Sequence, residues 1–366
     1  MVNVTVTEGF IEATERTRAP VGLGPRLRVK RVWPRHAVVF GLALSLAGGC
    51  ADDATSQPGE APEASPEPGE LAHTGDADPS DVTPEDHATA TQRVSIAFDA
   101  RVGAEPAVCG REYAALGTAA TPALLADARL FLADIELQNA DGEWVALALD
   151  QDTPWQAHSI ALLDFEDGSA ACAGSGDAAL NHQVVGELPA GTYAGLRFSV
   201  SVPPELNHND SAVAPAPLNV ATMFWNWRGG YKYLRVDWDT SVNGTIDFEA
   251  EDAPAVPRWN VHLGATQCVS AAATAPPDAP CGLPNRPEIV LPDFVASAHQ
   301  VVIDLGALVG GADLSANVEG TPPGCMSART EADDCAPVYR SLGLSFETGV
   351  CVDACDDQSV FALAPL

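Results

Sequence analysis

The sequence has 366 residues, with 19 Lys and Arg against 50 Asp and Glu, a formal net charge of −31. A chain this acidic repels phosphate backbones, which excludes a nucleic-acid-binding protein. The 31 glycines, 29 prolines and 6% aromatic residues exclude a long helical bundle or coiled coil. They favour an all-β protein with many turns.

The first 50 residues have the order of an export signal. The basic stretch PRLRVKRVWPRH is followed by the apolar run AVVFGLALSLAGG, which ends at Cys50. This run is shorter than the ~20 residues of a membrane-spanning helix. The small residues before Cys50 resemble a bacterial lipobox, and Ala51 favours the outer membrane. We expect a lipid-anchored cell-envelope protein, periplasmic or surface-facing; the alternative is an ordinary signal peptide with an unmodified cysteine.

Residues 51–92 are predicted to form a disordered acidic tether. They contain eleven acidic residues and six prolines, and neither Lys, Arg nor an aromatic residue. Such a segment buries too little apolar surface to offset the entropy of folding, and its charges repel each other. After a lipidated cysteine, it would hold a folded domain away from the membrane.

The folded part is predicted to be a single all-β domain over residues 93–366. Its short segments alternate apolar and polar residues and are separated by turns, which is typical of a β-sandwich or barrel-like fold with long loops. The predicted strands are 94–100, 128–138, 143–149, 158–166, 182–187, 192–201, 231–239, 245–251, 259–265, 287–294 and 300–308.

Eight cysteines follow Cys50, and an even number in an oxidising compartment predicts four disulfides. Three pairs are close in sequence, which favours bonds within them and leaves one further pair, although spacing alone does not fix the connectivity. Metal ligation by thiolates is the alternative, but no Cys-x-x-Cys pair supports it. The favoured disulfides are Cys268–Cys281, Cys325–Cys335, Cys351–Cys355 and Cys109–Cys172.

The residues suited to metal chemistry gather between positions 203 and 268. His208 and His262 lie in this stretch, and imidazole is the commonest transition-metal ligand. Either histidine alone is more often a hydrogen-bonded structural residue. Trp225 and Trp227 would share one face of a strand, and core packing is the simpler interpretation of both.

Several motifs in order resemble the MbnP family, also called metallo-mystery-pair four-Cys-motif proteins. The resemblance runs from about Val94 to Leu344. The matching motifs are WQAHSIALLDFEDG, LNHND, APLN, MFWNWRGGYKYLRVD, HLGATQC, CGLPNR and CMS…DC. It implies a protein that binds copper through histidines and kynurenine, an oxidised tryptophan. It also implies a partner, a di-haem MbnH-type protein that performs the oxidation.

Carried over residue by residue, the resemblance assigns copper to His208, His262 and a kynurenine made from Trp225. Trp227 is the second choice for the modified tryptophan, and Trp155 the third. The sequence departs from the family pattern at Arg228, where Gln is expected. It also carries two additional cysteines, Cys351 and Cys355.

The predicted function is therefore a lipid-anchored copper-binding protein that performs no turnover itself. The alternative is a surface module whose aromatic patch binds a protein or glycan without metal. A third reading, a copper oxidoreductase for electron transfer, is weaker because the His₂Cys pattern with an axial Met that marks blue-copper sites is absent.

Overall fold

A computed structural model describes residues 90–151, 153–226, 228–240 and 258–366. The predicted signal segment, nearly all of the predicted tether and the predicted strand 245–251 lie outside the described residues. The first strand begins at Thr91, two residues before the expected start of the folded part. All described residues belong to one compact unit.

The smaller of two main sheets runs in the order β18-β16-β1-β9-β6, with β2 paired to β1. β16 and β1 are parallel, while the other neighbours are antiparallel. Its strands are β1 (Thr91–Val102), β2 (Glu105–Pro106), β6 (Ala148–Leu149), β9 (Gln183–Pro189), β16 (His299–Asp304) and β18 (Phe361–Pro365).

The larger sheet runs in the order β15-β10-β4-β13-β14-β17. Short strands β3, β5 and β8 pair with the remaining edge of β4, and β7 pairs with β8. These strands are β3 (Glu112–Leu116), β4 (Thr121–Asn139), β5 (Trp144–Ala146), β7 (Gln156–Ala157), β8 (Ile160–Asp164), β10 (Tyr193–Val200), β13 (Leu234–Asp239), β14 (Arg258–Leu263), β15 (Glu288–Leu291) and β17 (Gly324–Cys325).

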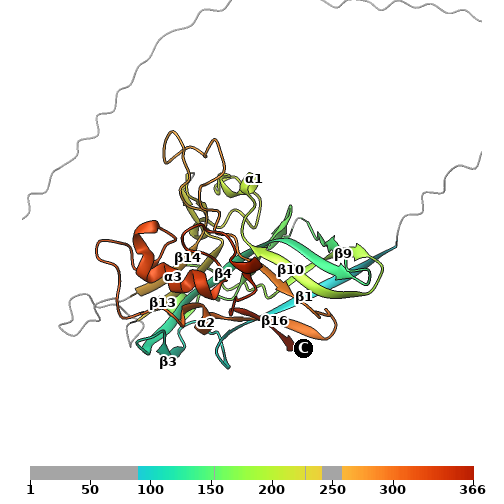
Figure 1. Cartoon of the computed structure of the whole chain (residues 1–366), viewed down its shortest axis with the longest axis horizontal. Helices are drawn as coiled ribbons and strands as arrows, with labels where there is room; N and C mark the ends of the chain where they lie inside the picture. The colour runs from blue at the N-terminus through green and yellow to red at the C-terminus, as the bar shows by residue number, and fades with distance from the viewer. Residues whose placement is uncertain (1–89, 152, 227, 241–257) are drawn as a thin grey trace, which may run out of the picture. The chain divides into compact units, whose positions relative to one another are not determined.

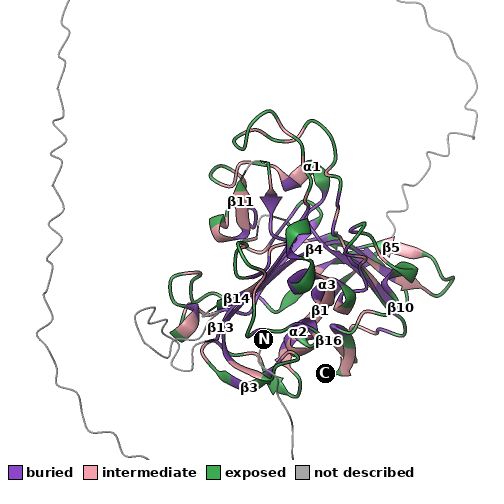
Figure 2. Cartoon of the chain, turned by 60° about the vertical axis from the view of Figure 1, so that its left-hand side comes forward, coloured by how far each residue is buried: buried purple, intermediate pink, exposed green. Residues whose placement is uncertain are grey.

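Strand β4 is the longest strand of the larger sheet and pairs with other strands along both of its edges. Leu124 pairs with Glu112 of β3 on one side and Asp239 of β13 on the other, and Leu130 pairs likewise with β8 and β13. The strand is buried without interruption from 123 to 133, as expected when both faces are covered. Figure 2 shows this burial concentrated in β4, β10, β13 and β14.

The two sheets share one hydrophobic core. Phe198 of the larger sheet lies 6.0 Å from Phe98 and 5.5 Å from Phe361 of the smaller sheet, both in edge-to-face geometry. Trp238 and Trp259 are cross-strand neighbours and fully buried. Within the described residues neither sheet closes on itself, so the all-β prediction is confirmed with an open sandwich rather than a barrel.

Helices are few and short. They are α1 (Pro204–Asn207), α2 (Leu305–Val309) and α3 (Ala332–Ser341), with 3₁₀ turns at Ala170–Cys172, Ala221–Met223, Arg329–Glu331 and Asp353–Cys355. The predicted strand 300–308 is wrong in its last third, because α2 begins there. The Asp304 carboxylate accepts the backbone N–H groups of Gly306 and Ala307 at 2.9 and 3.0 Å, which starts a helix.

A small antiparallel ribbon, β11 (Phe224–Asn226) with β12 (Gly230–Tyr231), stands beside α1. In Figure 1, α1 and the ochre loop that follows β14 rise together above the sheets. None of the described helices has the length and apolar character needed to span a membrane.

All eight domain cysteines form disulfides, which confirms the favoured pairing. Cys109–Cys172 closes the longest loop, with a sequence separation of 63, and Cys351–Cys355 the shortest, with a separation of 4. In the chain-entropy picture, a longer closed loop removes more freedom from the unfolded chain.

We predict that removing the long-range disulfide destabilises the protein more than removing the short-range one. The Cys109→Ala/Cys172→Ala variant should lose roughly 4 kcal/mol and Cys351→Ala/Cys355→Ala roughly 2 kcal/mol of unfolding free energy, measured by urea denaturation. Equal losses would show that local packing around the sulfurs, rather than loop closure, sets their contribution.

Candidate metal centre

Three segments far apart in the sequence meet above the larger sheet: α1, the β11–β12 ribbon and the loop after β14. The Asn207 Oδ1 accepts the backbone N–H of Tyr231 at 2.9 Å, which fixes α1 to the ribbon. Gly230 allows this approach, because a Cβ at that position would lie 2.5 Å from the Asn207 carbonyl oxygen. The ribbon in turn rests on Gly264, directly after β14.

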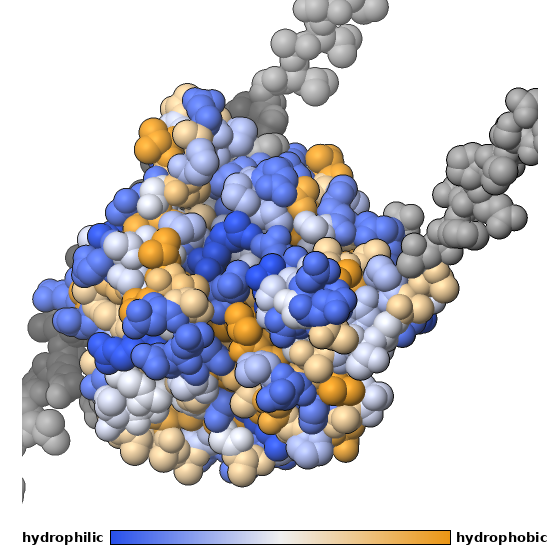
Figure 3. Space-filling view, turned by 45° about the vertical axis from the view of Figure 1, so that its right-hand side comes forward, coloured by the Kyte–Doolittle hydropathy of each residue, from blue (hydrophilic) through white to orange (hydrophobic). Residues whose placement is uncertain are grey.

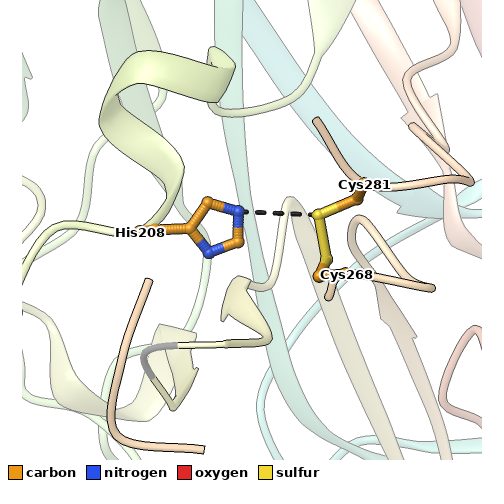
Figure 4. Close-up of side chains that lie close together, drawn as sticks. All are labelled: His208, Cys268 and Cys281. Atoms are coloured by element: carbon orange, nitrogen blue, oxygen red, sulfur yellow. Dashed lines mark hydrogen bonds between the residues drawn. A yellow bond between two sulfur atoms is a disulfide. The ribbon is translucent and has the colours of Figure 1, made fainter. Parts of the chain in front are cut away.

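His208 follows α1 and is half-buried. It lines a cavity of about 290 Å³ together with Tyr233, Arg286 and Cys281. Its Nε2 lies 3.2 Å from the Asn207 Nδ2 and 3.6 Å from the Cys281 Sγ. Figure 4 shows the imidazole facing the Cys268–Cys281 disulfide.

Trp225 lies on β11 and lines a second cavity, of about 500 Å³, with Arg228, Cys268 and Met326. Unlike the core residues Trp238 and Trp259, it is only partly buried. Its six-membered ring packs on Gly264 so closely that a Cβ there would lie 2.6 Å from the Trp225 Cζ3. This ring is therefore held firmly at one side and is open to a cavity at the other.

His262 lies on β14 and is buried, with 7% of its surface exposed. Its Nε2–H donates to Asp237 Oδ1 at 2.7 Å, and Asp237 Oδ2 also accepts from Arg235 at 2.6 and 2.9 Å. Gly264, against which the Trp225 ring lies, comes two residues after His262 and directly after the end of β14.

The hydrogen bond to Asp237 and the burial of the ring together determine the protonation state of the His262 imidazole. Burial lowers the pKa of His262 and outweighs the opposing pull of Asp237. Burial acts to raise the pKa of Asp237, but the hydrogen bond from His262 and the Arg235 charge bring it well below its usual range. At neutral pH Asp237 is ionised and His262 is neutral, with its proton on Nε2 and a lone pair on Nδ1.

His262 forms one end of a buried charged layer on one face of the larger sheet. Arg235 reaches Asp127 at 3.2 Å, and Arg129 pairs with Asp127 at 2.5 Å and with Glu166 at 3.6 Å. The strand register aligns Arg129 with Arg235, and Arg235 with His262. Asp127 pairs with both of these arginines, so each buried charge in the layer has a neighbour of opposite sign, as buried charges require.

Asp164, next to this layer, is a buried carboxyl group whose pKa burial raises to about 7. The backbone N–H of Glu166 donates to its Oδ1 at 3.1 Å, and the nearby Arg129 charge also favours the ionised form, but neither offsets the desolvation.

The structure brings His208 and Trp225 to neighbouring cavities that share Ala265 and are separated by the Cys268–Cys281 disulfide. His262 lines neither cavity; it lies two residues before the glycine that supports Trp225. Among the described residues, the sets of three or more potential metal-ligating groups within 4.8 Å of one another are His208 with Cys268 and Cys281, and Glu166 with Cys109 and Cys172. All four cysteines are disulfide-bonded and offer no thiolate, so copper ligation by His208, His262 and Trp225 stays a prediction.

The other predicted positions are not at this site or are not described. Trp227 and Cys50 lie outside the described residues. Trp155 lies just before β7 and lines neither cavity. Among the described residues, no cysteine is free to complete a blue-copper site.

Sequence reasoning missed three residues that shape the site: Asp237, Gly264 and Met326. Asp237 alternates with Arg235 in the run LRVD, and charges at every second position of a strand are a signal for one polar face. The same signal cannot show that another layer of chain covers that face. Gly264 and Met326 carried no signal of their own.

The comparisons with known proteins agree on one family. A family model described as MbnP matches residues 91–327. The solved structure of MbnP from Methylosinus trichosporium is similar, with 30% sequence identity and a TM-score of 0.61; the match covers 75% of this chain and 99% of that one. No curated protein matches the chain.

We predict that Asp164→Asn stabilises the protein progressively more as pH rises. The unfolded chain ionises Asp164 near pH 4 and the folded chain only near pH 7, so wild-type stability falls between these values. The asparagine Oδ1 can still accept from Glu166 N–H and has no charge to desolvate. In urea denaturation, the variant's advantage should grow by up to about 1.4 kcal/mol per pH unit over this window. A difference independent of pH would contradict the assignment.

Proposed function

Since the chain belongs to the MbnP family, we propose that it is a copper-binding protein of the bacterial cell envelope that performs no turnover itself. The proposed ligands are His208, His262 and a kynurenine formed from Trp225. The single observation that carries this assignment is the packing of the Trp225 ring on Gly264, which joins the tryptophan to the end of the strand that holds His262.

The two imidazoles have the chemistry that a copper site needs. Copper ligation requires neutral histidine. The bond from His262 to Asp237 leaves Nδ1 as the ligating atom, in the manner of carboxylate–histidine pairs at metal sites. For His208 the corresponding atom is Nε2. With no thiolate available in the described part of the chain, nitrogen and oxygen donors must complete the site.

Trp225 itself offers copper only an indole N–H, which is a donor and not a ligand. Oxidative opening of the ring to kynurenine would create an aniline nitrogen and a ketone, and either can approach a metal. We propose a di-haem MbnH-type protein as the partner that performs this oxidation. The partial exposure of Trp225 at the 500 Å³ cavity gives such a partner a surface from which to act.

A protein- or glycan-binding module without metal is the alternative function, and the surface gives it little support. The exposed large hydrophobic residues among those described are mostly far apart along the chain, for example Leu180, Val213 and Val269; Val350 and Val352 are the one close pair. On the face in Figure 3, apolar residues lie in small groups among polar ones rather than in one extended patch. Docking surfaces usually show a larger apolar area.

We predict that copper binding depends on both histidines and on oxidation of Trp225. Protein produced with the di-haem partner should show a gain of about 4 Da in the peptide containing Trp225, from the loss of one carbon and the gain of one oxygen. His208→Ala and His262→Gln should each weaken copper binding by more than about 100-fold in competition titrations. The glutamine retains a donor to Asp237, which protects the fold.

His158→Asn is the matched control, because His158 is exposed and lies away from both cavities. Asparagine tolerates its positive φ of 55°. This variant should bind copper like the wild type. Tight binding by protein with an unmodified Trp225, or by the variants at His208 and His262, would refute the proposed ligand set.

We predict that the anchor is lipid on Cys50, and that Cys50→Ser moves the protein from the membrane to the soluble fraction. Two or three acyl chains hold a protein durably at a membrane, whereas one chain binds only weakly. Fractionation followed by immunoblotting measures the distribution. A Cys50→Ser protein that still sediments with membranes would place the anchor elsewhere.

A further inference from the structure

The Cys268–Cys281 disulfide differs from the other three in its surroundings. Both of its cysteines are half-buried, and each faces a cavity: Cys281 the one beside His208, Cys268 the one beside Trp225. Every other disulfide has at least one cysteine that is 2% exposed or less. This is the disulfide that a reductant in solvent can reach most directly.

His208 presents an unprotonated nitrogen to this disulfide. Tyr231 N–H donates to the Asn207 Oδ1, so the Asn207 Nδ2–H group must face His208 Nε2, at 3.2 Å. Nε2 therefore accepts a hydrogen bond and carries no proton. The same Nε2 lies 3.6 Å from the Cys281 Sγ. A metal ion would replace the Asn207 N–H at this nitrogen.

The distance from nitrogen to sulfur matches one edge of a tetrahedral metal site. With metal–sulfur and metal–nitrogen bonds of about 2.3 and 2.0–2.1 Å, tetrahedral ligands lie about 3.5 Å apart. The Cys268 Sγ lies within 4.8 Å of the same nitrogen, and the two sulfurs are too close to each other because they are bonded. Breaking that bond would let them separate, since residues 269–280 between them are mostly exposed loop.

We propose that reduction of Cys268–Cys281 creates a second metal site, formed by the two thiolates and His208, for a soft ion such as Zn²⁺ or Cu(I). A dithiol, in the cell a thioredoxin-fold protein of the envelope, supplies two electrons and two protons. It becomes a disulfide while the Cys268–Cys281 bond becomes two thiols. Metal binding then releases both thiol protons, and water completes the coordination.

This site shares only His208 with the proposed copper site. It requires neither His262 nor the oxidation of Trp225, and it exists only in the reduced protein. The two modes share His208, so a copper ion held in the oxidised protein and an ion held by the thiolates exclude each other. Reduction would thereby change the donors beside His208 from nitrogen and oxygen atoms to two thiolate sulfurs.

The test uses Co²⁺ as a spectroscopic substitute for Zn²⁺. The full chain is treated with dithiothreitol under native conditions, and alkylation with mass spectrometry maps the thiols; desalted protein then receives Co²⁺. We expect the first thiols at Cys268 and Cys281, and one equivalent of Co²⁺ with thiolate charge-transfer absorption in the near ultraviolet. Untreated protein should show none.

Cys268→Ser/Cys281→Ser should abolish the charge-transfer band, and His208→Ala should weaken Co²⁺ binding by roughly 10-fold or more, whereas the control His158→Asn should not. The proposal is overturned if thiols appear first at other cysteines, if the reduced protein shows no such band, or if the Cys268→Ser/Cys281→Ser variant retains it. Copper titration of the oxidised protein tests the proposed function separately, because the oxidised protein has no thiols at Cys268 and Cys281.

Discussion

The orientation of His262, the buried candidate ligand, depends on one interaction, the Asp237 carboxylate between Arg235 and His262. A carboxylate this deeply buried needs a compensating charge, and removing Arg235 would leave it without its nearest one at a cost of about 3–5 kcal/mol. Removing the neutral His262 would leave the Asp237 Oδ1 without its hydrogen bond. The same bond fixes the His262 ring and directs its Nδ1 away from Asp237. Ser327 Oγ donates to the His262 carbonyl at 2.9 Å and holds the backbone as well. The hydrogen bond that the buried Asp237 needs therefore also orients His262 as a candidate metal ligand.

Above this layer, the site is held by close contacts and covalent bonds rather than by long regular elements. Gly230 and Gly264 permit main chain and aromatic ring to approach where no side chain would fit. The Cys268–Cys281 bond pins the long loop after β14 beside α1. A loop-rich site fixed in this way keeps His208 and Trp225 at defined positions, which lowers the entropy lost when a ligand binds.

Much of the architecture could be predicted because it depends on short-range patterns in the sequence. Alternation located most strands, and cysteine spacing favoured the correct disulfides. The start of α2 was missed because a single cap, Asp304, decides it. Helix α3 was missed because Pro337 lies inside it, and proline normally argues against a helix. At the site, His208, Trp225 and His262 came from family motifs. The charged layer beneath them was missed, since LRVD reads as a strand with an exposed polar face until tertiary packing covers it.

The central claim is that the oxidised protein holds copper through nitrogen and oxygen donors at the end of β14. X-ray absorption spectroscopy of copper-loaded, non-reduced protein produced with its di-haem partner tests this most directly, because it identifies the atoms bound to the metal. We predict that the atoms bound to copper are nitrogen and oxygen, with the multiple scattering that two imidazoles produce. A shell containing sulfur, or one without imidazole, would contradict it.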